Sequence, residues 1–275
     1  MGTTQRILPG VPGQPNWGDL NKSVTNIAKT VEKENNGQDD VENTTPEQQA
    51  KEYKKLIERR EYHLKTAFKN LVKTGGGSKN ITSGKSSSIG KAGLKSSGKL
   101  ISFFSNVGAG GLQYALTDIG FGTLTGKNIQ DVIDFLLVYC SDTNTGMDEM
   151  AANKASCEVL NELAEQSGNN LDEFEKLLKE YVEGKGLADV LCKFWGYYIF
   201  EHLSQRFQEK ITQQRGEAVS SETFRIIKDD ILGRVKVLNE SRPVKEIDWK
   251  GPEGKKEIES IFESIIKIIC DENND

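Results

Sequence analysis

The chain has 275 residues, of which 28 % are charged and 36 % hydrophobic, and its net charge at pH 7 is −5. This composition is typical of a soluble folded protein, and the mild acidity excludes a protein that coats nucleic acid with its whole surface. A membrane span needs about 20 consecutive apolar residues. The most apolar stretch, residues 187–203, predicts a buried helix instead, because it is interrupted by Asp189, Lys193, Glu201 and His202.

The cysteines give no sign of a metal centre. They are widely separated, no two form a Cys-x-x-Cys pair, and the chain has only two histidines. Structural zinc sites need closely spaced ligands, so we expect no metal and no other cofactor. With no signal peptide at the start, free thiols in the reducing cytoplasm are expected. These residues are Cys140, Cys157, Cys192 and Cys270.

The first eighteen residues predict a disordered tail. They hold three of the six prolines and four glycines, which favour an extended, polyproline-like chain over a helix or a strand. A stiff extended peptide can dock into a groove through apolar side chains. The alternative is an ordinary frayed terminus. The apolar anchors would be Ile7, Leu8, Val11 and Trp17, spaced by Pro9, Pro12 and Pro15.

A short helix and an acidic linker are expected next. Residues 21–31 carry apolar side chains at helical spacing, but a helix of this length is marginal outside a core and would form on binding a partner. Residues 32–44 are polar and acidic, which predicts a linker that extends the reach of the tail. We therefore assign residues 1–44 to a disordered tail and linker.

Residues 45–74 predict one long amphipathic helix. Thr45 has the character of an N-cap, Pro46 occupies the first helical position, and Gln48 can complete a capping box. The apolar residues that follow repeat mostly at intervals of three and four up to about Lys73, which leaves the opposite face charged. This helix should pack against a core or a partner.

Residues 75–99 form a segment rich in glycine, serine and lysine, predicted to be flexible. No acidic residue occurs between Lys69 and Thr117, so the segment could follow a phosphate backbone or an acidic partner. A solvated linker is the alternative, and the absence of interleaved aromatic residues weakens a role in base stacking. Gly84-Lys85-Ser86 does not make a P-loop, because Lys79 stands where the motif needs glycine. The candidate contacts are Lys79, Lys85, Lys91, Lys95 and Lys99.

Residues 100–275 predict a helical domain. The whole chain is therefore predicted to be all-α, an irregular multi-helix bundle preceded by the disordered tail. Helices are expected at about residues 129–139, 145–166, 170–183, 187–213, 221–238 and 253–270. The first of these should be central, because apolar residues occupy most of its faces. The aromatic residues between Phe194 and Phe200 should lie in the core, with a partner-binding face as the alternative, and Trp249 should fold back onto the bundle.

Residue types that could carry catalysis are few. Asp148 and Glu149 begin a predicted helix, where carboxylates stabilise the positive end of the dipole; a catalytic carboxylate pair is the less favoured alternative. Cys192 and His202 are ten residues apart on one helix, about 15 Å, which is too far for a nucleophile and its base. The sequence therefore predicts a protein that is not an enzyme.

Several short motifs resemble those of the QatB family, the non-enzymatic component of the bacterial Qat anti-phage defence system. They are Met1-Gly2-Thr3, Pro15-Asn16-Trp17-Gly18, the basic Gly-rich middle, Gly111-Leu-Gln-Tyr-Ala-Leu116, and Cys140 followed by Gly146-Met-Asp-Glu-Met-Ala151. Members are encoded beside an ATPase, a QueC-like enzyme and a TatD-like nuclease. QueC-like enzymes of defence systems attach a deazapurine-type base to the N-terminus of a partner protein.

The resemblance implies a role for the tail. After removal of Met1, Gly2 would be the acceptor, with Thr3 and Thr4 in the cleft of the QueC-like enzyme and Pro9 to Trp17 as the docking ribbon. The helical body would bind the ATPase, and the TatD-like nuclease is a further partner. The competing hypothesis is a nucleic-acid-binding module that uses residues 69–99.

Overall fold

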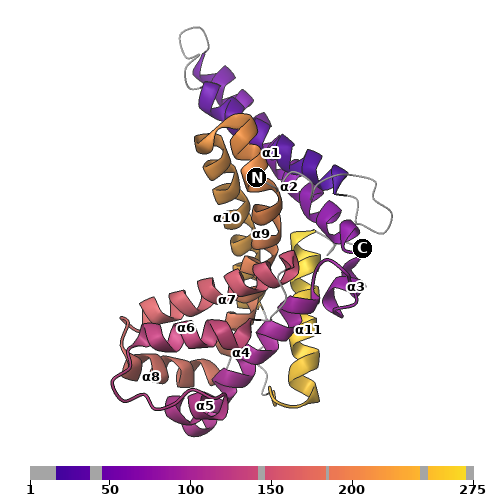
Figure 1. Cartoon of the computed structure of the whole chain (residues 1–275). Helices are drawn as coiled ribbons and strands as arrows, with labels where there is room; N and C mark the ends of the chain where they lie inside the picture. The colour runs from indigo at the N-terminus through magenta and orange to yellow at the C-terminus, as the bar shows by residue number, and fades with distance from the viewer. Residues whose placement is uncertain (1–16, 38–44, 142–145, 184–185, 242–246, 271–275) are drawn as a thin grey trace.

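The computed structural model describes residues 17–37, 45–141, 146–183, 186–241 and 247–270. Within these ranges the chain forms eleven helices and no strand, which confirms the all-α prediction (Figure 1). None of the described helices is both long enough and apolar enough to cross a membrane. Of the tail predicted over the first eighteen residues, residues 1–16 lie outside the described part of the chain, and Gly18 already begins the first helix.

The first helix, α1 (Gly18–Gly37), belongs to the core of the protein. Its apolar side chains Leu20, Val24, Ile27, Ala28 and Val31 are 0 % exposed, because α2, α9 and α10 pack against that face. The prediction that this helix forms only on binding a partner is therefore wrong. The linker predicted from Glu32 is also wrong as far as Gly37, and residues 38–44 lie outside the described residues.

The acidic end of α1 is held by arginines from other helices. Glu34 pairs with Arg60 of α2 and Glu32 pairs with Arg215 of α9. The acidic residues that suggested a solvated linker thus form ion pairs that join α1 to its neighbours. The ion-paired residues lie in the part of α1 that follows its last apolar residue, Val31.

The long helix α2 (Pro46–Thr74) matches its prediction closely. Thr45 and Gln48 form the expected capping box, in which the Gln48 backbone N–H donates to Thr45 Oγ1 at 3.4 Å and the Thr45 N–H donates to Gln48 Oε1 at 3.1 Å. Only its second half is buried, from Arg60 to Val72.

The segment predicted to be flexible is helical over part of its length. It contains α3 (Ser78–Thr82) and the start of α4 (Lys91–Gly110). Ile81 and Ile89 are 0 % and 2 % exposed and fix the segment to the core. Gly90 joins the two with φ of 108°, and a Cβ placed there would lie 2.1 Å from the Ile81 carbonyl oxygen, so only glycine fits.

The centre of the protein is α9 (Gly186–Arg215), which carries apolar and aromatic residues on all its faces. Around it lie α7 (Met147–Gln166), α10 (Glu217–Ser241) and α11 (Pro252–Ile269) (Figure 1). Trp195 of α9 stacks on Phe262 of α11 with ring centroids 3.7 Å apart, which confirms the predicted core role of these aromatic residues. Trp249 also packs against the core, as predicted.

The remaining helices, α5 (Leu112–Asp118), α6 (Ile129–Cys140) and α8 (Leu171–Val182), lie at one end of the molecule (Figure 1). The prediction that α6 is central is wrong, because it packs mainly on α7 and α4 and its Val138 is 74 % exposed. Apolar residues on most faces of a helix therefore did not identify the core helix in this case.

Candidate functional site

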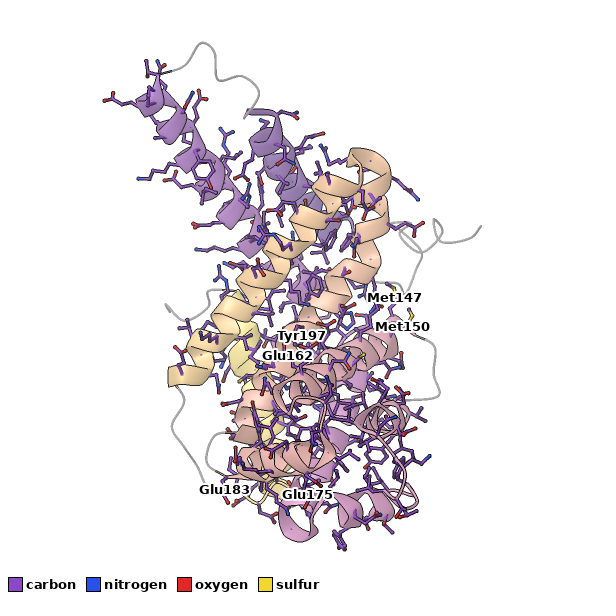
Figure 2. The ribbon with its side chains drawn as sticks, turned by 90° about the vertical axis from the view of Figure 1, so that its left-hand side faces the viewer. Met147, Met150, Glu162, Glu175, Glu183 and Tyr197 are labelled. Carbon is purple, nitrogen blue, oxygen red and sulfur yellow. The ribbon has the colours of Figure 1, made fainter. Side chains whose placement is uncertain are left out.

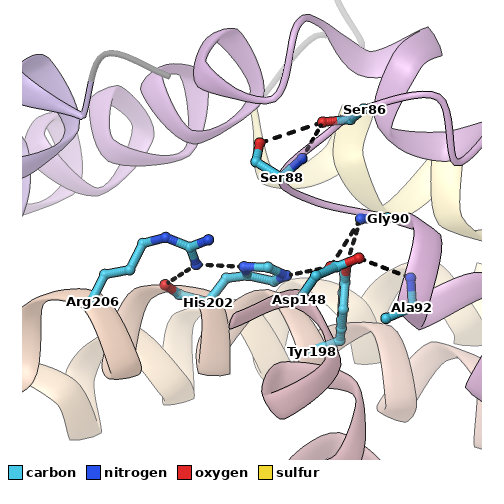
Figure 3. A network of polar contacts seen from close by, with 8 residues as sticks. All are labelled: Ser86, Ser88, Gly90, Ala92, Asp148, Tyr198, His202 and Arg206. Carbon is cyan, nitrogen blue, oxygen red and sulfur yellow. Dashed lines mark hydrogen bonds and ion pairs between the residues drawn. The ribbon is translucent and has the colours of Figure 1, made fainter. Parts of the chain in front are cut away.

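The carboxylate of Asp148 connects α7 to two other helices (Figure 3). Its Oδ1 accepts hydrogen bonds from the Tyr198 hydroxyl of α9 and from the backbone N–H of Gly90, at 3.2 Å, while Oδ2 accepts from the N–H of Ala92 at 2.8 Å. The first N–H groups of a helix lack partners within the helix. Asp148 thus stands in the first turn of α7, as predicted, and in addition caps the start of α4.

The buried imidazole of His202 continues this network. Its Nε2 lies 3.0 Å from Asp148 Oδ1, and its Nδ1 lies 2.5 Å from Nη1 of Arg206, which also donates to the His202 carbonyl oxygen at 2.9 Å. Because a guanidinium group only donates, Nδ1 must be the acceptor and Nε2 must carry the proton. His202 is therefore neutral and donates to Asp148.

Burial and the positive charge of Arg206 lower the pKa of His202 to about 4, although Asp148 acts in the opposite direction. Burial alone would raise the pKa of Asp148, but the hydrogen bonds from His202, Tyr198 and the Ala92 N–H outweigh it and lower this pKa to about 2. Burial lowers the pKa of Arg206 to about 10. At neutral pH the network thus holds one carboxylate and one guanidinium, joined through a neutral imidazole.

This arrangement does not allow His202 to act as a general base. Both ring nitrogens are occupied, and the side chain is 0 % exposed. The network around His202 therefore fixes the relative positions of α4, α7 and α9. A separate contact lies nearby, in which the Ser88 N–H donates to the Ser86 hydroxyl at 3.3 Å (Figure 3).

Arg206 extends the network to the point where the tail begins. Its guanidinium carbon lies 4.2 Å from the ring centroid of Trp17, a cation–π contact, and Trp17 directly precedes α1. Trp17 is partly buried against the core. The structure therefore places this predicted partner-binding residue against the chain's own body. The other predicted tail residues, Gly2, Thr3, Thr4, Ile7, Leu8, Pro9, Pro12 and Pro15, lie outside the described residues.

A second connection joins α7 and α9 on another face. Figure 2 labels Tyr197 and Glu162, and the hydroxyl of Tyr197 donates to Glu162. The other oxygen of Glu162 lies 2.5 Å from Nζ of Lys193. Lys228 of α10 lies over the Tyr197 ring, 4.9 Å from its centroid, and pairs with Glu158 at 2.9 Å. These polar contacts join α7, α9 and α10.

The five candidate lysines have different surroundings. Nζ of Lys99 donates to the carbonyl oxygens of Tyr139 and Ser141, at 2.6 and 3.2 Å, and so caps the C-terminal end of α6. Lys79 and Lys85 are exposed near α3. Lys91 and Lys95 line a cleft together with residues of α11.

The cleft lies between α4 and α11 and has a volume of about 680 Å³. Its lining adds Trp249, Lys250 and Lys255 to the two lysines of α4. No sequence pattern indicates this grouping, because more than 150 residues separate Lys95 from Trp249. The network on α9 was not predicted either, although Tyr198, His202 and Arg206 follow one another at intervals of four, the spacing that places polar groups on one face of a helix.

The comparisons with known proteins agree with the motifs. The family model described as "Qat anti-phage system associated protein QatB" matches residues 76–269, which include the cleft and the network around Asp148. No curated protein and no solved structure gives a significant match. Since the family model covers more than half of the chain, this protein belongs to the QatB family and is a component of a Qat anti-phage system.

Proposed function

We propose that this protein is a non-catalytic adaptor of the Qat system whose N-terminal tail is a substrate. A QueC-like partner recognises residues 1–16 and modifies the amino group of Gly2 after removal of Met1. The helical body binds other proteins of the system, including the ATPase.

The observation that carries this proposal is the anchoring of the chain at Trp17. The Arg206 guanidinium lies against the Trp17 ring, and Leu20 and Val24 of α1 are fully buried, so the tail leaves the body at a fixed point. Gly2 lies fifteen positions before Trp17, and a fully extended chain of this length reaches about 50 Å. An enzyme docked beside α1 could therefore take up Gly2 without unfolding any of the described helices.

The surroundings of His202 support the non-catalytic part of the proposal. Asp148 and Arg206 occupy both ring nitrogens, which leaves this imidazole no position for a substrate proton. Asp148 in turn accepts four hydrogen bonds, a satisfied carboxylate that stabilises the fold rather than a carboxylate free to react.

Intact-mass measurement after co-expression with the QueC-like enzyme tests the modification. We expect a mass increase on the wild-type chain. Gly2→Ala keeps a small residue after Met1, so we expect an equal or smaller fraction of this variant to show the same mass increase. Gly2→Glu should retain Met1 and remain unmodified. An unmodified wild-type chain, or a modification that persists in Gly2→Glu, would contradict the proposal.

Truncation separates the two roles of the adaptor. A chain that begins at Trp17 should still co-purify with the ATPase but should not bind the QueC-like enzyme. Loss of both interactions would show that the tail serves more than modification, and retention of both would place the QueC-like contact on the body.

A further inference from the structure

The cleft between α4 and α11 brings together basic residues from separate parts of the chain. The α4 side presents Lys91, Leu94, Lys95, Gly98 and Ser102, which follow helical spacing along one face. The opposite side presents Lys255, Ile258 and Glu259 of α11, and the turn before α11 supplies Trp249 and Lys250. Residues about 150 positions apart thus form one surface.

The charge of this surface favours an anion. Four lysines line the cleft, against two acidic residues, Asp118 and Glu259. Asp118 accepts a hydrogen bond from the Asn106 side chain at 3.1 Å. Within the described part of the chain, the ammonium groups of Lys91, Lys250 and Lys255 form no ion pair, so they remain available to a ligand.

The cleft also contains the aromatic residue that the basic segment lacks. Trp249 is partly buried, packs against the core and lines the cleft between the lysines. An aromatic side chain set among lysines is the usual surface for single-stranded nucleic acid, in which a base stacks on the ring while cations hold the phosphates. The volume of about 680 Å³ falls in the range that encloses ligands of the size of a nucleotide.

We propose that this cleft binds single-stranded nucleic acid, with phosphates at Lys91, Lys250 and Lys255 and one base against Trp249. A duplex keeps its bases stacked inside and cannot offer one to the tryptophan. The described residues that line the cleft run from Ser83 to Glu259 in the chain, so the proposed binding needs no modification of Gly2.

Fluorescence anisotropy with the full-length protein and a fluorescein-labelled 12-nucleotide single strand tests the proposal. We expect saturable binding at 50 mM salt that weakens as salt rises, with a slope of log affinity against log salt of about −2 if three phosphates are neutralised. Trp249→Ala should weaken binding by about 5- to 100-fold, the effect of losing one base stack. Lys91→Gln with Lys255→Gln should weaken binding and reduce the slope by about 1.4.

Gly98 offers a steric test that changes no charge. A Cβ placed on Gly98 meets no atom within 4 Å, so a large side chain there would extend into the cleft. Gly98→Phe should abolish binding, whereas Gly98→Ala should retain it. Equal thermal unfolding temperatures of the two variants would show that the loss comes from occlusion and not from misfolding.

Two controls separate the cleft from a general basic surface. Lys73→Gln with Lys79→Gln removes the same charge from the same acid-free segment, outside the cleft, and should change affinity less than twofold. The proposal is overturned by absence of binding at 50 mM salt, or by a loss that follows Lys73 and Lys79 instead of the cleft lysines. It is also overturned if 1 mM ATP displaces the strand completely, which indicates a mononucleotide pocket, or if polyglutamate binds equally well and tolerates Trp249→Ala.

Discussion

The neutral state of His202 determines how the stability of this protein should change with pH. The perturbation is acidification from pH 7.5 to pH 5, and the quantity compared is the stability that the wild-type chain and His202→Gln each lose. Glutamine can donate from its amide nitrogen to Asp148 and accept from Arg206 through its carbonyl oxygen, so it preserves both hydrogen bonds without titrating. The difference between the two proteins isolates the imidazole.

The direction of the pKa shift of His202 decides whether acidification raises or lowers the free energy of unfolding. The pKa of His202 is lowered from 6.5 to about 4 in the folded protein, so between these values the unfolded chain binds more protons. The stabilisation is therefore complete above pH 6.5 and is lost as the pH falls towards 4. The dependence of stability on proton binding, with these two pKa values for the unfolded and folded protein, gives a loss of about 2 kcal/mol in the free energy of unfolding between pH 7.5 and pH 5. The corresponding contribution of Asp148, whose pKa is lowered from 3.8 to about 2, is lost only below about pH 4.

Thermal unfolding followed by circular dichroism at pH 7.5, 6.5, 5.5 and 5 measures this effect. We expect the unfolding temperature of the wild-type chain to fall by roughly 4–8 °C more than that of His202→Gln across this range. Other carboxylates and His63 titrate in both proteins and cancel in the comparison. Equilibrium denaturation at pH 7.5 and pH 5 gives the same difference as a free energy.

Parallel pH profiles of the two proteins would show that the pKa of His202 is not lowered in the folded protein. A wild-type chain that gains stability relative to His202→Gln on acidification would be a stronger contradiction. That result would mean that His202 is a cation paired with Asp148 and that its pKa is raised, with the Arg206 contact arranged differently.

The remaining predictions concern packing and are read from thermal or chemical unfolding. Gly93→Ala should destabilise by about 1–3 kcal/mol, since its Cβ would lie 2.6 Å from a Trp195 ring carbon, whereas Gly98→Ala should stabilise by up to about 1 kcal/mol. Ile27→Ala should lower the free energy of unfolding by about 2–5 kcal/mol, because Ile27 is fully buried, while deletion of residues 1–16 should leave the unfolding temperature unchanged. An Ile27→Ala variant as stable as the wild-type chain would place α1 outside the core. Trp17→Ala should cost about 1–2 kcal/mol and speed hydrogen exchange at the start of α1, and unchanged exchange would refute the anchoring role.

The sequence determined most of the secondary structure, because local signals specify helix ends. Thr45 and Gln48 form the predicted capping box, and Asn170 caps α8 by accepting from the N–H groups of Asp172 and Glu173 at 2.9 and 3.1 Å. These interactions involve residues a few positions apart, so the chain encodes them without reference to the rest of the fold.

Local sequence signals did not predict which helices are buried in the core. The apolar α6 lies at one end, whereas α1, expected to need a partner, is completely buried on one face. Burial depends on which other helices are present to cover a face, and that information is spread over the chain. Glu32 and Glu34 show the same limit, because their arginine partners lie on α9 and α2.

The sequence alone therefore determined the family resemblance, the all-helical class and the positions of most helix ends, since each rests on short stretches of neighbouring residues. Only the tertiary structure decided what the polar side chains do. It joined Asp148 to Gly90, Ala92 and His202, and it brought Trp249 and Lys255 to the lysines of α4. Contacts between distant residues form when helices pack, and no local pattern in the chain records them.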